Sequence, residues 1–204
     1  MTSLALSDRI KISQTDPKAA TVLEAGYETF LLFGLKRASM QDIADRAGMS
    51  RAALYLHFKN KDDIFRAMMA AYYAAAAEAA GEALAANEDV AKSLIAAFDA
   101  QLGDAGERLM CSPHAEEMMS MKHKAADVIM EGHRNLALVY ARWLEKGVQT
   151  GKVDPVAVAG SAERTAQVML SALDGMKLGS QDWDSYIAAR RHLARIFARA
   201  ISTS

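Results

Sequence analysis

The stretch GMSRAALYLHFKNKDDIF, residues 48–65, predicts a very short helix followed at once by another. Ser50 suits the N-cap of a helix that ends near Phe58, because its hydroxyl can accept a hydrogen bond from the first turn. Leu54 and Phe58 are four residues apart and therefore share the inward face of that helix. Asn60 then suits the cap of the next helix.

A second short helix precedes this stretch. Ser39 and Asp42 have the spacing of a capping box, in which each side chain bonds the other residue's backbone. Gly48 suits the position after a helix end, where left-handed backbone is common. A longer helix over 17–33 comes before both, with Pro17 at its first position. Two short helices joined by a glycine-containing turn predict a helix-turn-helix.

The whole chain has the pattern of an all-α protein. Its 204 residues are 51% hydrophobic, with three prolines, and apolar residues recur at spacings of three and four. A long fourth helix is expected to begin at Lys61 and to break near Asn87. We expect a flexible N-terminal tail at 1–16, a helix-turn-helix domain at 17–62 and a larger helical domain at 63–204.

The expected helices leave one irregular stretch. On the first helix, Val22, Phe30 and Phe33 are expected to face inward. Residues 103–113 hold two glycines and a proline and are expected to be irregular. The remaining helices are expected at 88–102, from 114 to about 151, at 155–177 and at 182–201.

Composition narrows the class of protein. The single cysteine, Cys111, excludes an intrachain disulfide framework and suits the reducing cytoplasm. Residues 1–16 hold no long apolar segment, so we expect no signal peptide. The longest charge-free apolar run, residues 67–77, is shorter than the roughly 20 residues that a membrane-spanning helix needs. The net charge of -1 argues neither for nor against nucleic-acid binding. The positions of the charged residues must therefore be used to judge whether the protein binds nucleic acid.

The outward face of the helix near 51–58 carries groups that suit DNA. Arg51 at the helix start can reach a guanine edge, and small side chains behind it let the backbone approach closely. Hydroxyl, imidazole and ammonium donors suit phosphates, as does the start of the preceding helix. These residues are Ser39, Arg51, Ala52, Ala53, Tyr55, His57 and Lys61. The alternative is that Tyr55 and His57 border the domain core.

Residues 38–65 read ASMQDIADRAGMSRAALYLHFKNKDDIF. They resemble the pattern TSMQDIAxxAGVSxxxLYxHFxxKxxLF of the TetR family of bacterial repressors. The resemblance covers about a quarter of the chain. It departs at Met49, where valine is common, and at Ala53, which lacks a frequent hydroxyl and so puts a contact there in doubt.

The resemblance implies a homodimer that binds a DNA operator and responds to a small-molecule effector. Carried over by position, Ser39, Met40 and Gln41 resemble DNA contacts, while Arg51, Ala52 and Ala53 resemble base-reading positions. Tyr55, His57 and Lys61 resemble phosphate contacts. The last two helices are implied to pair with their copies as a four-helix bundle. Residues compatible with that interface are Ala159, Ala162, Ala166, Tyr186, Leu193 and Phe197; the alternative is that both helices are core.

Soft apolar side chains mark a candidate effector pocket in the larger domain. Twelve methionines are many for this length, and methionine suits adaptable apolar surfaces. We expect an apolar or amphipathic effector, although the same residues could simply fill a core. The candidates are Phe98, Leu102, Met110, Met118, Met119, Met121, Met130, Tyr140, Trp143, Met169 and Leu173.

Other chemistry finds little support. Cys111, His114, Glu116, Glu117 and His123 lie close in the sequence, but no established metal-binding spacing is present, and we expect neither a metal nor a cofactor. An all-α enzyme is a remote alternative, because Asp62 and Asp63 are better explained by a helix start and no catalytic fingerprint occurs. A DNA-binding protein of the same fold without a ligand is the other alternative.

Overall fold

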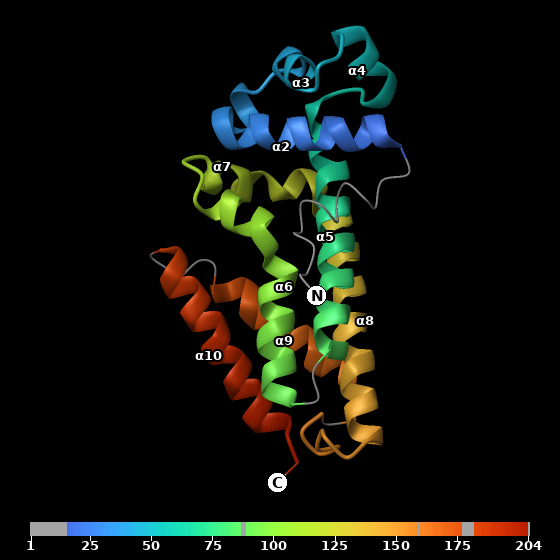
Figure 1. Cartoon of the computed structure of the whole chain (residues 1–204), viewed down its shortest axis with the longest axis vertical. Coiled ribbons are helices and arrows are strands. Elements are labelled where there is room, and N and C mark those ends of the chain that lie inside the picture. Colours follow the sequence, from blue (N-terminus) through green and yellow to red (C-terminus); the bar gives the residue numbers. More distant parts are fainter. Residues whose placement is uncertain (1–15, 87–88, 159, 177–181, 204) are drawn as a thin grey trace. The chain divides into compact units, whose positions relative to one another are not determined.

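The computed structural model describes residues 16–86, 89–158, 160–176 and 182–203. This part of the chain is helical, as expected, and its strand-like pairing is one isolated bridge between Val153 and Ser202. The expected tail at 1–16 falls almost wholly outside the described residues. The elements (Figure 1) are α2 (Pro17–Arg37), α3 (Met40–Arg46), α4 (Arg51–His57), α5 (Lys61–Ala86), α6 (Val90–Met110), α7 (Ala115–Ser120), the 3-10 helix η1 (Met121–Ala125), α8 (Ala126–Gln149), α9 (Ala162–Met176) and α10 (Trp183–Ile201).

The described residues pack as two compact units. Unit 1 comprises those up to Ala75 together with Asp104–Gly132. Unit 2 comprises Ala76–Gly103 and the described residues from His133 onward. Helices α5, α6 and α8 therefore each contribute to both units. The sequence-based division after residue 62 was drawn on function rather than packing, and it stays a prediction.

Side-chain caps define the beginnings of the helices of unit 1. The side chain of Asp16 accepts a hydrogen bond from the Lys18 backbone at the start of α2. Ser39 forms the expected capping box at the start of α3. Ser50 accepts from the Ala53 backbone at 3.1 Å. These side chains satisfy backbone N–H groups that have no partner within a helix, so each helix begins at its cap.

Unit 1 closes around one apolar cluster. Phe30, Ile43, Leu54 and Ile64 are fully buried in it, and they come from α2, α3, α4 and α5 respectively. The prediction for Phe33 was wrong, because its side chain is 45% exposed. The helical path breaks one residue later, so Phe33 does not continue the inward face of α2.

Gly34 interrupts α2 where the sequence predicted a helix end. Its backbone has φ 75° and ψ 159°, a region that essentially only glycine occupies, and a short helical segment follows to Arg37. A Cβ at Gly34 would lie 2.5 Å from Oε2 of Glu117 on α7. Glu117 accepts a hydrogen bond of 2.7 Å from the Lys36 backbone. Glycine here therefore permits both the turn and the docking of α7.

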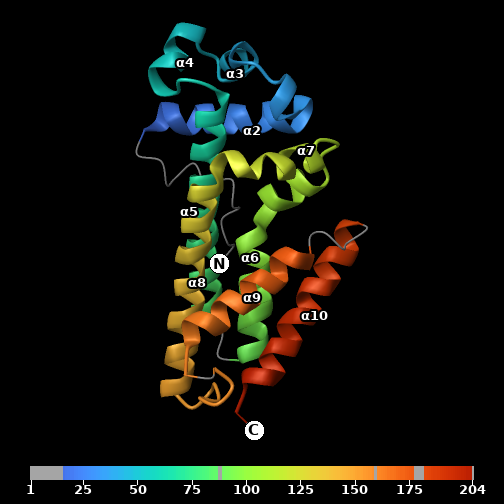
Figure 2. The ribbon, with the colours of Figure 1, turned by 180° about the vertical axis from the view of Figure 1, so that it is seen from behind.

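Unit 2 is built mainly from α6, α8, α9 and α10. Leu94 and Phe98 on α6 are fully buried in its core, as are Tyr140 on α8 and Met169 on α9. Helix α10 packs against α9 (Figure 2). The helix expected at 88–102 is thereby confirmed over its described residues, and it begins at Val90.

Two helix boundaries differ from expectation. Residues 103–113 were expected to be irregular, but α6 resumes after a break at Gly103, which has φ 58°, and runs to Met110. The hydroxyl of Tyr27 donates to the Ala105 carbonyl at 2.5 Å and fixes the resumed segment within unit 1. Helix α9 begins at Ala162 rather than near 155, because Asp154 accepts from the Val156 backbone in a turn instead of capping a helix.

The two positive-φ glycines of unit 1 give a matched test. Gly34→Ala should destabilise the protein by about 1–3 kcal/mol through its backbone, and further by displacing Glu117. Gly48→Ala, at φ 66° with nothing within 4 Å of the added methyl group, should cost only about 1–2 kcal/mol. Urea unfolding followed by circular dichroism measures both. Equal losses would show that the contact with Glu117 does not matter.

Candidate nucleic-acid interface

Helices α3 and α4 form the expected helix-turn-helix. The turn between them contains Gly48 at φ 66°, and the Met49 backbone donates to the Ala44 carbonyl at 3.0 Å. Helix α3 packs against both α2 and α4 (Figure 1). Buried Leu54 anchors α4 to the core of unit 1. Both short helices are therefore fixed to the same core, with one face of α4 turned outward.

The outward face of α4 carries the predicted residues. Arg51, Ala52 and Tyr55 are exposed, and Ala53 is half-buried. Leu56 is 86% exposed on the same helix, and the sequence analysis did not single it out. The signal was available, because Leu56 lies two positions after the inward Leu54 and so cannot share its face.

Arg51 and Tyr55 contact each other on α4. Nη2 of Arg51 donates to the hydroxyl of Tyr55 at 3.3 Å. The guanidinium carbon also lies 5.5 Å from the centre of the Tyr55 ring. A cation over an aromatic face is attracted to it, so the two side chains restrict each other. Their spacing of four residues on a helix makes this contact possible.

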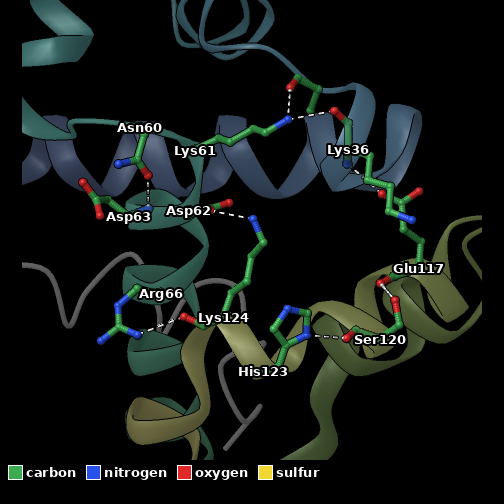
Figure 3. A network of polar contacts seen from close by, with 11 residues as sticks. Lys36, Asn60, Lys61, Asp62, Asp63, Arg66, Glu117, Ser120, His123 and Lys124 are labelled. Carbon is green, nitrogen blue, oxygen red and sulfur yellow. Dashed lines mark hydrogen bonds and ion pairs between the residues drawn. The ribbon is translucent and has the colours of Figure 1, made fainter.

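His57 and Lys61 have partners within unit 1. Nδ1 of His57 lies 3.2 Å from Oδ2 of Asp16, the residue that caps α2. Nζ of Lys61 donates to the carbonyl oxygens of Lys36 at 2.8 Å and Ala38 at 2.9 Å (Figure 3). Lys61 thereby joins the beginning of α5 to the end of α2, immediately before α3. An ammonium group has three donors, so one remains for a phosphate.

The beginning of α3 is more acidic than a simple phosphate site. Ser39 is exposed, but its hydroxyl donates to Oδ2 of Asp42 at 2.6 Å. Hydrogen bonds from Ser39 hold the pKa of Asp42 below its ordinary value, so this carboxylate stays charged. Gln41 is exposed and donates to Asp45 at 2.7 Å. Met40 is 9% exposed in the core of unit 1, which leaves little of its side chain for DNA.

A polar network joins the first turns of α5 to η1 and α8 (Figure 3). Lys124 of η1 donates to Asp62 on α5 at 2.6 Å. Arg66 on α5 donates to the Lys124 carbonyl at 2.9 Å. Both terminal nitrogens of Arg66 also donate to Asp127 on α8, each at 2.7 Å. The sequence analysis missed these contacts, because they join residues about sixty positions apart.

Three of the residues considered as metal ligands each contact a different backbone group. Nε2 of His114 contacts the Leu32 carbonyl at 3.1 Å, Glu117 accepts from the Lys36 backbone, and Nδ1 of His123 contacts the Ser120 carbonyl at 2.9 Å. Within the described ranges, no group of three or more His, Cys, Asp or Glu residues is placed to hold a metal ion. Cys111 is an exposed free thiol.

The predicted effector-pocket residues are divided between the two units. Met130 is 71% exposed, whereas Met118 is buried in the core of unit 1 and Tyr140 in that of unit 2. A ligand held by unit 2 alone would therefore contact mainly aromatic and aliphatic members of the set. Those in unit 2 are Phe98, Leu102, Tyr140, Trp143, Met169 and Leu173; those in unit 1 are Met110, Met118, Met119, Met121 and Met130.

Most of the predicted interface residues of α9 and α10 face the core of unit 2. Ala166 and Tyr186 are fully buried, and half-buried Leu193 and Phe197 pack against that core, as does Ala162. Ala159 lies outside the described residues. The opposite faces of these helices carry other apolar side chains, with Val168 55% exposed and Ile196 50% exposed.

Comparison with known proteins agrees with this geometry. Residues 22–68 match the sequence profile of the bacterial regulatory proteins, tetR family. The HTH-type transcriptional regulator TtgR of Pseudomonas putida is 25% identical over 169 residues, which cover 77% of this chain and 77% of TtgR. None of the helices in the described ranges is long and apolar enough to cross a membrane.

Solved structures share the fold. A transcriptional regulator from Cytophaga hutchinsonii ATCC 33406 matches with a TM-score of 0.75 at 18% identity, covering 92% of this chain and 100% of that one. SmeT, the repressor of the Stenotrophomonas maltophilia multidrug efflux pump SmeDEF, matches with a TM-score of 0.65 at 18% identity, covering 91% of each chain. The profile match and the related regulators, which are not enzymes, identify a helix-turn-helix transcriptional regulator. Residues 22–68 are therefore a DNA-binding domain of the TetR family.

The pair of Arg66 and Asp127 predicts a pH-dependent contribution to stability. Hydrogen bonds from Arg66 hold the pKa of Asp127 at about 2, below the ordinary 3.8. A carboxyl group with a lowered folded-state pKa stabilises the fold fully above pH 3.8 and loses that effect as the pH falls towards 2. Asp127→Asn should therefore lower the Tm near pH 7, and the difference from the parent protein should shrink between about pH 4 and about pH 2.

Differential scanning calorimetry across this pH range measures the effect. Arg66→Met should cause the same pH-dependent loss of Tm. The double variant should lower the Tm little further, because both changes remove the same ion pair. A constant difference in Tm at every pH would show that Asp127 acts through packing and not through its charge.

Proposed function

We propose that the protein is a cytoplasmic, ligand-responsive repressor that binds a palindromic DNA operator as a homodimer. The observation that carries this proposal is the exposed pair of Arg51 and Tyr55 on α4, a helix fixed by its Ser50 cap and by buried Leu54. A helix anchored in this way presents its outer face as a rigid surface. That surface suits insertion into a major groove, which admits one α-helix.

Within this proposal, α4 reads bases and its neighbours hold the backbone. Arg51 reads a guanine, and Ala52 and Ala53 allow close approach. Tyr55, His57 and the remaining donor of Lys61 contact phosphates, together with Ser39 and Gln41 at the beginning of α3. The buried side chain of Met40 has no place among these contacts, and Asp42 limits how closely α3 can approach a phosphate. Leu56 adds an apolar contact of the kind that thymine methyl groups accept.

The dimer interface is proposed on the outer faces of α9 and α10. These faces carry exposed side chains at spacings of three and four residues, and all but that of His192 are apolar or small, which allows close packing of helices. They replace the buried Ala166 and Tyr186 of the sequence-based prediction. The proposed residues are Val168, Ser171 and Gly175 on α9, and His192, Ile196 and Ala200 on α10.

An effector would act by shifting the population of dimer conformations. Two reading helices must enter successive major grooves, roughly 34–36 Å apart. A ligand that binds better to a dimer with another spacing would release the operator. The sign of regulation is supported by SmeT, whose name describes it as a repressor. A protein of this fold that binds DNA without any ligand is the second candidate, and the ligand experiment below separates the two.

Arg51→Ala should weaken operator binding by roughly 5- to 150-fold, because a bidentate contact to guanine is worth about 1–3 kcal/mol of discrimination. Affinity for a scrambled duplex should change much less. The operator is first obtained by selecting genomic DNA fragments on the purified protein, and fluorescence anisotropy at fixed salt then gives the Kd.

The matched control is Arg134→Ala, which removes an exposed arginine of α8 in unit 2. This variant should bind the operator as the parent protein does. An unchanged Kd for Arg51→Ala, or enrichment of no sequence at moderate salt, would overturn the base-reading assignment.

Ile196→Glu should convert the dimer to a monomer, because it places a charge in the proposed apolar interface. Val156→Glu is the control, since Val156 is 81% exposed in the loop before α9 and should tolerate the same change. Multi-angle light scattering distinguishes the 22.1 kDa chain from twice that mass. A dimer that survives Ile196→Glu, or a parent protein that is monomeric, would contradict the proposed surface.

A further inference from the structure

Arg190 on α10 is the one charged side chain that is buried among the described residues. It is 2% exposed within the core of unit 2. The guanidinium group of arginine keeps its positive charge in proteins. Placing such a charge in an apolar core costs several kcal/mol unless an opposite charge accompanies it. The core of unit 2 therefore holds a permanent positive charge that needs explanation.

The partners of Arg190 are all neutral. Nη1 donates to the hydroxyl of Tyr186 at 2.9 Å, and Nη2 donates to the carbonyl oxygen of Phe98 on α6. The guanidinium carbon lies 5.2 Å from the centre of the Tyr186 ring. Nε has no hydrogen-bond partner. No carboxylate in the described part of the chain pairs with this guanidinium, so its charge is solvated only in part.

Further polar groups lie in the same apolar core. The hydroxyl of Tyr140 donates to Oε1 of Gln101 at 3.2 Å, and both residues are buried. Burial raises the pKa of Tyr140 far above its ordinary value, while the charge of Arg190 lowers it. Arg190 is therefore close enough for its charge to act on Tyr140, which stays protonated. A few convergent polar groups inside an apolar shell are typical of a small-molecule site.

We propose that Arg190 anchors the carboxylate of a monoanionic ligand with an apolar body, bound within unit 2. The buried charge is a single positive one, so one carboxylate neutralises it, whereas a dianionic phosphate would leave a negative charge in the core. A guanidinium also matches the planar geometry of a carboxylate. The inference rests on the proposed function, because this ligand would be the effector that the regulator senses.

Binding would also change the contacts of α6. The Phe98 carbonyl now accepts from Nη2 of Arg190, and Phe98 precedes the break of α6 at Gly103. A carboxylate that takes over this donor releases the Phe98 carbonyl, so α10 and α6 lose a direct polar link. The ligand thus binds where α10 is joined to α6, five residues before the break of that helix at Gly103.

The test compares decanoate, decan-1-ol and decyl phosphate as probes of equal chain length on the full-length protein. Decanoate should raise the Tm by roughly 5–10 °C when present at about one hundred times its Kd. The alcohol and the phosphate should bind at least tenfold more weakly by isothermal titration calorimetry. The ligand-binding experiment contains no DNA. Its failure would therefore not contradict operator binding, and a failure of operator binding would not affect the measured ligand affinities.

Arg190→Met should lose the preference for decanoate over decan-1-ol and should fold, because replacing an unpaired buried charge by an apolar group of similar size is often neutral or stabilising. Arg190→Lys keeps the positive charge without the planar donors, so it should keep part of the preference for decanoate. It serves as the second variant if Arg190→Met fails to fold. Arg191→Met is the matched control, since Arg191 is exposed and pairs with Asp99. It should bind decanoate as the parent does.

Three outcomes would overturn the proposal. Equal binding of decanoate and decan-1-ol would show that the site recognises only the apolar chain. Tighter binding of decyl phosphate would show that a second cation takes part. Binding of no probe, or an unchanged decanoate preference in Arg190→Met, would leave Arg190 as a purely structural link between α10 and α6.

Discussion

Seven-residue helices are too short to persist in water, so α3 and α4 depend on what fixes their ends and inner faces. Ser39 and Ser50 satisfy the free N–H groups at their beginnings, and Leu54 anchors α4 in the core of unit 1. Lys61 then holds the segment that leads into α3 through the carbonyls of Lys36 and Ala38. The reading surface is rigid because each short helix is held at its beginning and along its inner face.

Local signals allowed much of this arrangement to be predicted. A cap and its first turn are neighbours in sequence, so the capping box at Ser39 and the positive φ of Gly48 follow from a few residues. Contacts between distant segments carry no such signal. Nothing near Gly103 in the sequence indicates that α6 resumes after it, because the contact that fixes the resumed segment comes from Tyr27, 78 positions away from its partner. The pairing of Arg66 with Asp127 escaped prediction for the same reason.

The prediction for α9 and α10 shows a different limit. Small and apolar residues occur on two faces of each helix, and the sequence pattern does not say which face meets the protein's own core. Ala166 and Tyr186 turned out to be buried, whereas Val168 and Ile196 are exposed. The charge at Arg190 was overlooked because an arginine on an amphipathic helix ordinarily points to water. Only its 2% exposure and neutral partners distinguish it from its neighbour Arg191.

The contact between Arg51 and Tyr55 has a consequence for how the operator evolves with the protein. Arg51 donates a hydrogen bond to Tyr55 and lies over its ring, so the two side chains do not contribute independently to the free energy of DNA binding. Loss of Tyr55 leaves Arg51 free to adopt more rotamers, and each must then be restricted again when a base is read. Substitutions at these two positions therefore constrain each other, and a change in base preference at α4 is accessible mainly through paired changes.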